Sequence, residues 1–228
     1  MFTLASAKQQ AGGISSRNSK MPGSSFALPP SKCATGGKLM DVVGSVCHKC
    51  YAVKSENMYP SVRKGWSDNY LSATAMIANN PKQWARAMAF QIERHAIKNS
   101  EPYHRWFDAG DLASVEMLIA IVETCKLTPQ IHHWLPTREA RLVKLWRDAG
   151  GVEPDNLVIR ISSTMIGDAP RNAPNTSTVH NHGAEYVGRA CPSTSDAHRA
   201  HRADKKANCA DCRACWDKTV CNVSYPLH

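Results

Sequence analysis

The sequence predicts an α/β protein in which a layer of parallel strands, resembling part of a (β/α) barrel, carries its helices on the outside. Short apolar runs typical of buried strands alternate with amphipathic helical segments between residues 104 and 162. The order strand, helix, strand, helix, strand is typical of parallel units with right-handed crossovers. The 228 residues, 43% of them hydrophobic, suffice for one large domain, alone or with a small appendage.

Residues 1–32 are predicted to be an extended arm, because they are rich in Ser, Gly, Lys and Pro and show no periodicity. Three apolar side chains in this arm, Met21, Phe26 and Leu28, are expected to pin it to a core. A loop with three cysteines follows, and it begins the predicted α/β body at residues 33–175.

Two helices are predicted after the cysteine loop. The first begins at Ser67 or Asp68, at a polar helix start. Its apolar spacing predicts a buried side formed by Leu71, Ala75, Ile77 and Ala78. The second opens with Pro81, which suits the first helical turn. Its predicted buried stripe is Trp84, Met88 and Ile92, with weaker members Gln91 and His95.

Three apolar runs are predicted to be strands, at residues 104–108, 131–136 and 156–162. The segments between them have helical spacing and are predicted to be helices, at residues 114–127 and 138–150. The second of these helices ends at two glycines, which are typical of a helix stop.

Polar side chains lie where each predicted strand ends. Asp111 closes the DAGD turn after the first strand, Thr137 lies at the end of the second, and Ser162 at the end of the third. Functional groups of parallel sheets gather at the carboxyl ends of strands. We therefore expect these three residues to line one cofactor-binding rim, with Asp111 as the candidate catalytic residue. The alternative is that each residue only caps a helix.

The last quarter of the chain, residues 176–228, is predicted to be an irregular, cysteine-rich segment packed on the body. Clean periodicity is lost after about residue 167, and residues 167–183 are expected to be a loop. One short strand is predicted in the sequence YVGRACP, which leads into Cys191.

This tail contains the pattern C-x2-C-x2-C at Cys209, Cys212 and Cys215. The pattern is the three-ligand half of a ferredoxin-type site, in which two-residue spacing lets successive sulfurs reach adjacent corners of a cubane. A mononuclear zinc more often uses two C-x2-C pairs separated by a longer gap. The fourth ligand is expected to be Cys191, which precedes a proline, with Cys221 as the competitor.

A second group of thiols, Cys33, Cys47 and Cys50, lies in the loop before the helices. Three thiolates can hold a [4Fe-4S] cluster and leave one iron open to a substrate, a water or a chelating cofactor. His48 is an alternative ligand, and a solvated loop histidine is the simpler interpretation of it. The remaining cysteine, Cys125, lies on the apolar face of a predicted helix and is expected to be a core residue.

Composition indicates the compartment and the partners. The chain starts without the charged and apolar pattern of a secretory signal, and no apolar run is long enough to cross a membrane. A reducing cytoplasm is therefore expected, where clustered cysteines favour metals over disulfides. The net charge of +9 allows nucleic-acid contact without demanding it. One basic cluster is present, formed by Arg199, Arg202, Lys205 and Lys206.

Five segments carry a family resemblance: NSKMPGSSFALPPSKC, CHKCYA, RWFDAGDLASVEML, WLPTRE and CADCRACWDKTVCNVSYPLH. In this order they resemble the phage-encoded gene product eighty-eight-like proteins over nearly the whole chain. The resemblance implies a viral origin and expression in a host cytoplasm. It supplies no activity.

The layout also looks, more loosely, like a radical S-adenosylmethionine enzyme, with three cysteines in a loop before a partial (β/α) barrel. This resemblance implies that Cys33, Cys47 and Cys50 hold a cluster whose open iron binds S-adenosylmethionine, and that Asp111 holds the amino group of that cofactor. The trailing cysteines resemble auxiliary-cluster segments. The spacing departs from the family pattern, because C-x13-C-x2-C replaces C-x3-C-x2-C. A longer gap can still close around a cubane, since loop-closure cost rises slowly with length.

The sequence therefore predicts an iron–sulfur protein of viral origin with one or two [4Fe-4S] clusters. A closed four-cysteine cluster is suited to electron transfer, and a three-cysteine cluster with an open iron is suited to radical-type chemistry. The expected partner is a redox protein or a small molecule. The alternative is a zinc-binding module that interacts with nucleic acid through tetrahedral sites and a basic face.

Overall fold

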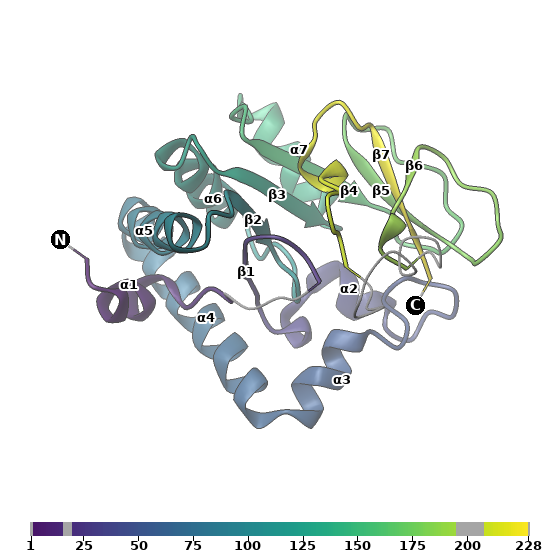
Figure 1. Ribbon diagram of the computed structural model, residues 1–228. Helices are drawn as coiled ribbons and strands as arrows, with labels where there is room; N and C mark the ends of the chain where they lie inside the picture. Colours follow the sequence, from purple (N-terminus) through teal and green to yellow (C-terminus); the bar gives the residue numbers. More distant parts are fainter. Residues whose placement is uncertain (1, 16–19, 195–207, 228) are drawn as a thin grey trace.

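The computed structural model describes residues 2–15, 20–194 and 208–227. Its centre is a seven-stranded sheet in the order β1-β2-β3-β4-β5-β7-β6, in which every neighbouring pair is parallel. The α/β class and the parallel sheet predicted from the sequence are confirmed, and the sheet stays open instead of closing into a barrel (Figure 1). The strands are β1 (Ser24–Phe26), β2 (Tyr103–Trp106), β3 (His132–Thr137), β4 (Leu157–Ser162), β5 (Thr176–His180), β6 (Arg189–Ala190) and β7 (Asn222–Pro226).

Helices fill the connections in the first two thirds of the chain. They are α1 (Leu4–Ala11), α2 (Ala34–Leu39), α3 (Tyr51–Met58), α4 (Pro60–Asn79), α5 (Pro81–Asn99), α6 (Val115–Leu127) and α7 (Ala140–Asp148). Short 3₁₀ turns lie at η1 (Pro30–Lys32), η2 (Pro192–Thr194) and η3 (Ala214–Trp216). None of the helices within the described ranges is long and apolar enough to cross a membrane.

The two faces of the sheet pack against different parts of the chain. Successive strand residues point to opposite faces. Trp106 and Leu135 accordingly lie in the large core shared with α1, α4, α5, α6 and α7, whereas Trp134 packs against Trp216 of η3. In Figure 1 the C-terminal segment, in yellow, lies over β4, while α1, α4, α5 and α6 stand on the left. The cysteine-rich tail thus covers the face that the helices leave.

The tail contributes β5, β6 and β7 to the sheet; β6 lies within the predicted short strand YVGRACP, whereas β5 and β7 lie in segments expected to be irregular. Residues 167–183, expected to be a loop, include β5, and β7 pairs with β5 along its whole length. Sequence patterning missed these strands because their buried residues are polar and satisfy one another. The Oγ1 of Thr178 donates to the Oγ of Ser224 (3.0 Å), and the amide of Asn222 donates to the Oγ1 of Thr178 (3.0 Å).

The N-terminal segment also has more regular structure than predicted. The expected extended arm forms α1 and β1, and its Phe26 and Leu28 are buried in the core as expected. The helix expected to begin at Ser67 or Asp68 begins at Pro60. Of its predicted buried residues, Leu71, Ala75 and Ala78 face outward; the buried side is Asn69, Ala73 and Ile77.

Asn69 explains the shift of the α4 face, because a polar residue there is as buried as the apolar ones. Its side-chain amide donates to the carbonyls of Gly13 (3.0 Å) and Ala27 (2.9 Å), which fastens the first segment of the chain to α4. The predictions for α5 are confirmed: Trp84, Met88, Gln91, Ile92 and His95 are all buried. Cys125 lies in the core, as predicted.

Candidate functional site

The loop with the first three cysteines crosses the carboxyl edge of the sheet. It starts shortly after β1, and farther along it bonds to the segment that follows β4. There the amide of Val46 donates to the carbonyl of Thr164 (2.9 Å), and the amide of Ile166 donates to that of Gly44 (2.9 Å). The loop therefore lies over the edge where β1 to β4 end, which we call the rim.

The structure brings Cys33 and Cys47 together around Gly36. A β-carbon added at Gly36 would stand 3.4 Å from the Cys47 sulfur, 3.8 Å from the Cys33 sulfur and 3.1 Å from the Cys33 Cβ. Cys33 is the N-cap residue of α2, and Cys50 is the N-cap residue of α3; neither side chain makes a capping hydrogen bond. The absence of a side chain at Gly36 thus keeps open a gap lined by thiols.

Burial and mutual proximity set the acidity of these thiols. Burial, followed by the charges of Asp111, Cys47 and Cys50, raises the pKa of Cys33 to about 12. Burial also raises the pKa of Cys47, and the positive charge of Arg138 opposes that rise. In the absence of metal, Cys33 and Cys47 are therefore neutral near pH 7. Because metals bind thiolates, any metal that bound here would release protons.

Two of the three predicted rim residues meet beside these thiols. The Oδ1 of Asp111 accepts hydrogen bonds from the hydroxyl of Thr137 (2.5 Å) and the amide of Leu112 (2.7 Å), and its Oδ2 accepts from the amide of Arg138 (2.9 Å). Burial raises the pKa of Asp111 against the effect of these bonds. Ser162 lies at the end of β4, where its Oγ accepts from the hydroxyl of Ser177 (2.9 Å).

Two neighbours of the thiols were not expected from the sequence. Glu139 accepts from the amide (2.7 Å) and the hydroxyl (2.8 Å) of Thr35, which ties α2 to the end of β3. Arg138 acts electrostatically on Cys33, Cys47 and Asp111. Arg138 and Glu139 follow Thr137 directly, and this position after a predicted strand end could have indicated that they lie at the rim. His48, the alternative ligand, has its Nδ1 hydrogen-bonded to the carbonyl of Met40 (3.0 Å).

The rim holds buried polar atoms that have no hydrogen-bond partner. They are the Oδ1 of Asp108, the Nε of Arg138 and the Oγ of Ser163, which follow β2, β3 and β4 respectively. Buried polar groups are nearly always paired, so each unpaired one requires an explanation. One acceptor, one cationic donor and one hydroxyl at neighbouring strand ends are suited to a polar ligand.

The tail thiols form a second group, on the face of the sheet opposite to the helices. Cys191, Cys209 and Cys212 pack against a buried cluster that includes Cys215, Met21, Trp134 and Trp216. Burial and the thiols of Cys191 and Cys212 raise the pKa of Cys209 to about 11. Burial, with Cys191 and Cys209 nearby, raises the pKa of Cys215 to about 12, although the hydroxyl of Tyr225 lies 3.1 Å from its sulfur.

The two candidates for the fourth tail ligand are placed differently. Cys191 follows β6, and its amide donates to the carbonyl of Ser224 in β7 (2.8 Å), which brings it to the other tail thiols. Cys221 is exposed, and its sulfur lies 3.9 Å from the carbonyl of Thr219.

A buried arginine holds the tail against the sheet. Arg160 of β4 is fully buried, and its guanidinium donates to five backbone carbonyls. Four of them lie in or just after η3: Ala214 (2.7 Å), Cys215 (3.1 Å), Asp217 (2.8 Å) and Val220 (2.8 Å); the fifth is Thr176 of β5 (3.2 Å). Sequence reasoning missed this residue, although a charge inside the apolar run NLVIRIS was a signal.

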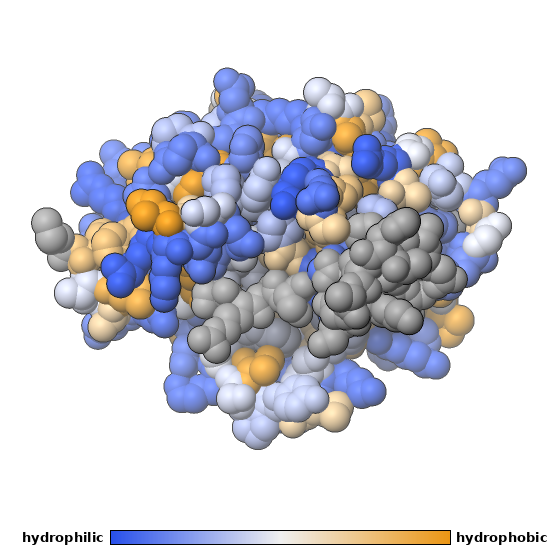
Figure 2. Space-filling model, in the orientation of Figure 1, coloured by the Kyte–Doolittle hydropathy of each residue, from blue (hydrophilic) through white to orange (hydrophobic). Residues whose placement is uncertain are grey.

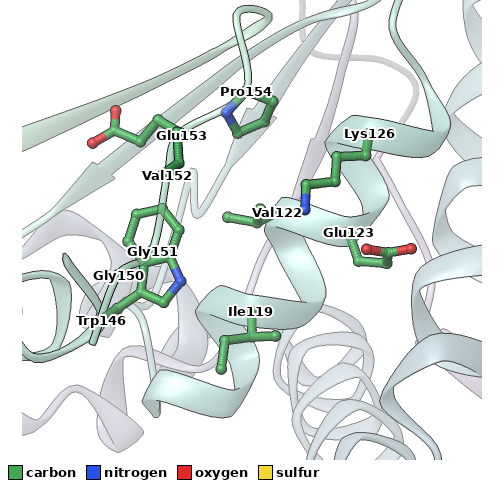
Figure 3. Close-up of a pocket in the computed structure, with 10 residues that line it drawn as sticks. All are labelled: Ile119, Val122, Glu123, Lys126, Trp146, Gly150, Gly151, Val152, Glu153 and Pro154. Carbon is green, nitrogen blue, oxygen red and sulfur yellow. The ribbon is translucent and has the colours of Figure 1, made fainter. Parts of the chain in front are cut away.

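Two surface cavities lie at the amino edge of the sheet, away from the rim. One, of about 440 Å³, lies between α6 and the loop after α7, with Trp146 on one side and Ile119 and Val122 on the other (Figure 3). The other, of about 300 Å³, is lined by Tyr103, His132 and residues of the tail. No cysteine lines either cavity. The face shown in Figure 2 is largely hydrophilic, with apolar residues in small scattered groups.

Within the described residues, no group of three or more histidine, cysteine, aspartate or glutamate side chains is arranged to hold a metal ion. The predicted basic cluster, Arg199, Arg202, Lys205 and Lys206, lies outside the described residues. The structure provides two groups of thiols: one at the rim, which includes Cys33 and Cys47, and one in the tail, which includes Cys191, Cys209, Cys212 and Cys215.

The family model named Gene product 88 matches residues 3–218. This chain belongs to the Gene product 88 family. The resemblance to these phage gene products that the sequence indicated is thereby confirmed. No curated protein and no solved structure matches the chain. Membership of the Gene product 88 family fixes the relatives of this protein and leaves its activity to be inferred from the site.

Proposed function

We propose that this Gene product 88 protein binds two [4Fe-4S] clusters and takes part in redox or radical-type chemistry in the cytoplasm of the phage host. Cys191, Cys209, Cys212 and Cys215 would close one cluster in the tail. Cys33, Cys47 and Cys50 would hold the other at the rim. The observation that carries this proposal is the gathering of the sequence's two cysteine motifs into two separate neighbourhoods of thiols.

The residues at the rim suit a cluster in three respects. Gly36 leaves a gap beside the Cys33 and Cys47 sulfurs that any other side chain would fill. The unpaired Nε of Arg138 is a donor available to a cluster sulfide. Its positive charge offsets the negative charge of three thiolates, and such hydrogen bonds and charges are known to tune iron–sulfur sites.

The rim cluster would have one iron without a protein ligand among the described residues. Two of the rim carboxylates are engaged, because Asp111 accepts three hydrogen bonds and both oxygens of Glu139 accept from Thr35, whereas Asp108 keeps one unpaired oxygen. The Nδ1 of His48 is hydrogen-bonded to the carbonyl of Met40, so only its Nε2 could act as a ligand atom. An exchangeable small molecule is the ligand that this arrangement favours.

A second candidate function, radical-type catalysis with S-adenosylmethionine, is favoured by the unpaired rim atoms. The Oδ1 of Asp108 could accept from an ammonium group, and the Nε of Arg138 could donate to a carboxylate, so an amino-acid moiety matches both. When bound to a reduced cluster, S-adenosylmethionine supplies a carbon radical. On this proposal Asp111 shapes the rim through Thr137 and Arg138, and Asp108 is the freer carboxylate.

The decisive experiment is anaerobic purification followed by measurement of iron, sulfide and zinc per chain. Two cubanes require about eight irons and a brown colour with broad absorption near ~400 nm. Replacement of Cys47 by Ser and of Cys212 by Ser should each remove about half of the iron. A colourless protein that carries stoichiometric zinc would instead support the zinc-binding, nucleic-acid-interacting alternative.

The radical-type candidate has its own test. Protein reduced with dithionite and mixed with S-adenosylmethionine should show a changed electron paramagnetic resonance signal and form 5′-deoxyadenosine. Asp108→Asn should weaken this response without loss of iron, whereas Asp41→Asn, at an exposed residue of the loop that holds the first three cysteines, should not. An intact cluster that gives neither a spectral change nor product leaves electron transfer as the function.

A further inference from the structure

Stacked side chains line the cavity of about 300 Å³ at the amino edge of the sheet. Tyr103 of β2 and His132 of β3 are opposite each other in the sheet, and their rings stack with centres 5.3 Å apart and planes 24° apart. The guanidinium of Arg213 lies over the Tyr103 ring, 4.9 Å from its centre. Tyr103 is therefore in contact with both a cation and an imidazole, and all three side chains line the cavity.

Trp216 of η3 holds this stack in place from the tail. Its ring meets Tyr103 edge to face, with centres 5.4 Å apart, and packs in the same way on Trp134 at 5.2 Å. Its Nε1 donates to the carbonyl of His104 (2.9 Å). Trp216 and Trp134 are buried, whereas His132 is exposed. The stack is thus anchored in the protein and presents the His132 ring to the cavity.

Charged side chains of both signs complete the lining of this cavity. Two of them are tied to the protein: the Nζ of Lys218 donates to the carbonyl of Pro154 (2.8 Å), and Asp217 is hydrogen-bonded within its own loop. Asp155 is exposed, and its carboxylate has no hydrogen-bond or ion-pair partner among the described residues. The cavity therefore combines stacked rings, a cation and an available acceptor.

We propose that this cavity binds a nucleobase, either of a free nucleotide or of a single-stranded nucleic acid. A planar base would stack on the exposed ring of His132, because aromatic side chains bind bases through their π faces. The guanidinium of Arg213, held by the bond from its Nη1 to the carbonyl of Cys212 (3.0 Å), is suited to a phosphate. The carboxylate of Asp155 is suited to an amino group on the edge of the base.

Two further observations favour a nucleotide over an uncharged aromatic ligand. The chain has a net charge of +9, which attracts ligands that carry phosphates. An uncharged ring would stack on His132 but would leave Arg213 and Asp155 without a role. No cysteine lines this cavity, so the site is independent of the proposed clusters.

The test measures, by fluorescence anisotropy on the full chain, binding of a fluorescein-labelled single-stranded oligonucleotide and of an abasic strand of equal length. The abasic strand should bind much more weakly, because it keeps the phosphates and lacks the rings. His132→Ala should weaken binding of the base-containing strand by about fivefold to about a hundredfold, the range for loss of one stacking contact. His132→Phe keeps a ring and should stay close to wild type. His182→Ala, at an exposed histidine after β5, is the matched control and should bind as wild type does.

Calorimetric titration with nucleoside monophosphates distinguishes the two sources of the base. Saturable binding of a monophosphate that His132→Ala weakens identifies a free nucleotide, whereas binding of the strand alone identifies single-stranded nucleic acid; both support the site. Equal binding of the base-containing and abasic strands would show that charge alone attracts the strand, and would overturn the proposal. An unchanged affinity in His132→Ala, or no binding of any of these probes to wild-type protein, would overturn it as well. Circular dichroism of each variant checks that the fold is retained.

Discussion

Gly36 and Gly37 are adjacent residues of α2 that differ in what surrounds them. A methyl group at Gly36 would enter the gap between the Cys33 and Cys47 sulfurs, at 3.8 and 3.4 Å, and would press on the Cys33 Cβ at 3.1 Å. A methyl group at Gly37 would meet no atom within 4 Å. Neither glycine has a positive φ, so alanine fits the backbone at both positions. Gly36→Ala and Gly37→Ala are therefore a matched pair.

The two substitutions should have opposite effects. Alanine in place of glycine within a helix gains up to about 1 kcal/mol, so Gly37→Ala should leave cluster loading unchanged and stabilise α2 slightly. Gly36→Ala has the same gain, but crowding of a packed site costs about 1–3 kcal/mol. A cubane would need the space that the methyl group takes. At about 1.4 kcal/mol per tenfold change, a cost of about 1–3 kcal/mol should weaken binding of a cluster at the rim site by about fivefold to about a hundredfold.

The assay is anaerobic reconstitution of wild type and both variants, with iron and sulfide measured per chain. Gly36→Ala should retain the tail cluster alone, which is about four irons in place of about eight. Circular dichroism and a thermal melt show whether the fold persists. The reasoning is refuted if Gly36→Ala loads as much iron as Gly37→Ala, because the gap at Gly36 would then have no role in holding a cluster.

Three further predictions concern the tail and the core. Cys191→Ser should remove the tail cluster, whereas Cys221→Ser should keep it; iron loss in Cys221→Ser with none in Cys191→Ser would reverse the assignment of the fourth ligand. Arg160→Lys keeps the charge but can satisfy at most three of the five carbonyls, so it should destabilise the protein by about 3 kcal/mol and expose the tail to protease. Burial lowers the pKa of His133 to about 3. Below about pH 6.5 the unfolded chain therefore binds a proton at His133 that the folded chain excludes. The free energy of unfolding should decrease as the pH falls below about 6.5, and His133 contributes at most about 1.4 kcal/mol per pH unit to this decrease. His133→Gln should flatten that slope in urea unfolding between pH 6.5 and 5.5, and an unchanged slope would contradict the assignment.

The elements predicted correctly are those whose buried residues are apolar and periodic. In α5 and α6 the spacing of large apolar side chains matches the geometry of the helix, so local sequence is sufficient. β5 and β7 were not predicted, because their buried side chains are Ser, Thr and Asn residues that hydrogen-bond to one another across the two strands. Such strands are stabilised by pairing with residues more than 40 positions away, and no local pattern records that pairing.

The candidate site likewise contains residues that could be predicted from the sequence and residues that could not. The rule that function gathers at the carboxyl ends of parallel strands was enough to predict that Asp111 and Thr137 would meet. The role of Glu139 could not be predicted, because its partner Thr35 lies 104 residues away. Gly36 looked like an ordinary loop glycine until the structure placed two sulfurs beside it.

The position of Cys191 shows that pairing of strands, and not the spacing of cysteines alone, organises the tail thiols. β6 pairs with β7 so that Ala190 is opposite Ser224, and the amide of Cys191 then bonds to the Ser224 carbonyl. The next residue of β7, Tyr225, places its hydroxyl 3.1 Å from the Cys215 sulfur. Strand pairing thus brings Cys191 to the other thiols, and Arg160 of β4 fixes the backbone around Cys215.

Because both interactions are made by the protein itself, the tail should keep its place when metal is removed. Arg160→Lys should therefore expose the tail to protease more than chelation of the metal does, and the reverse order would show that the metal, through its binding energy, is what folds this segment.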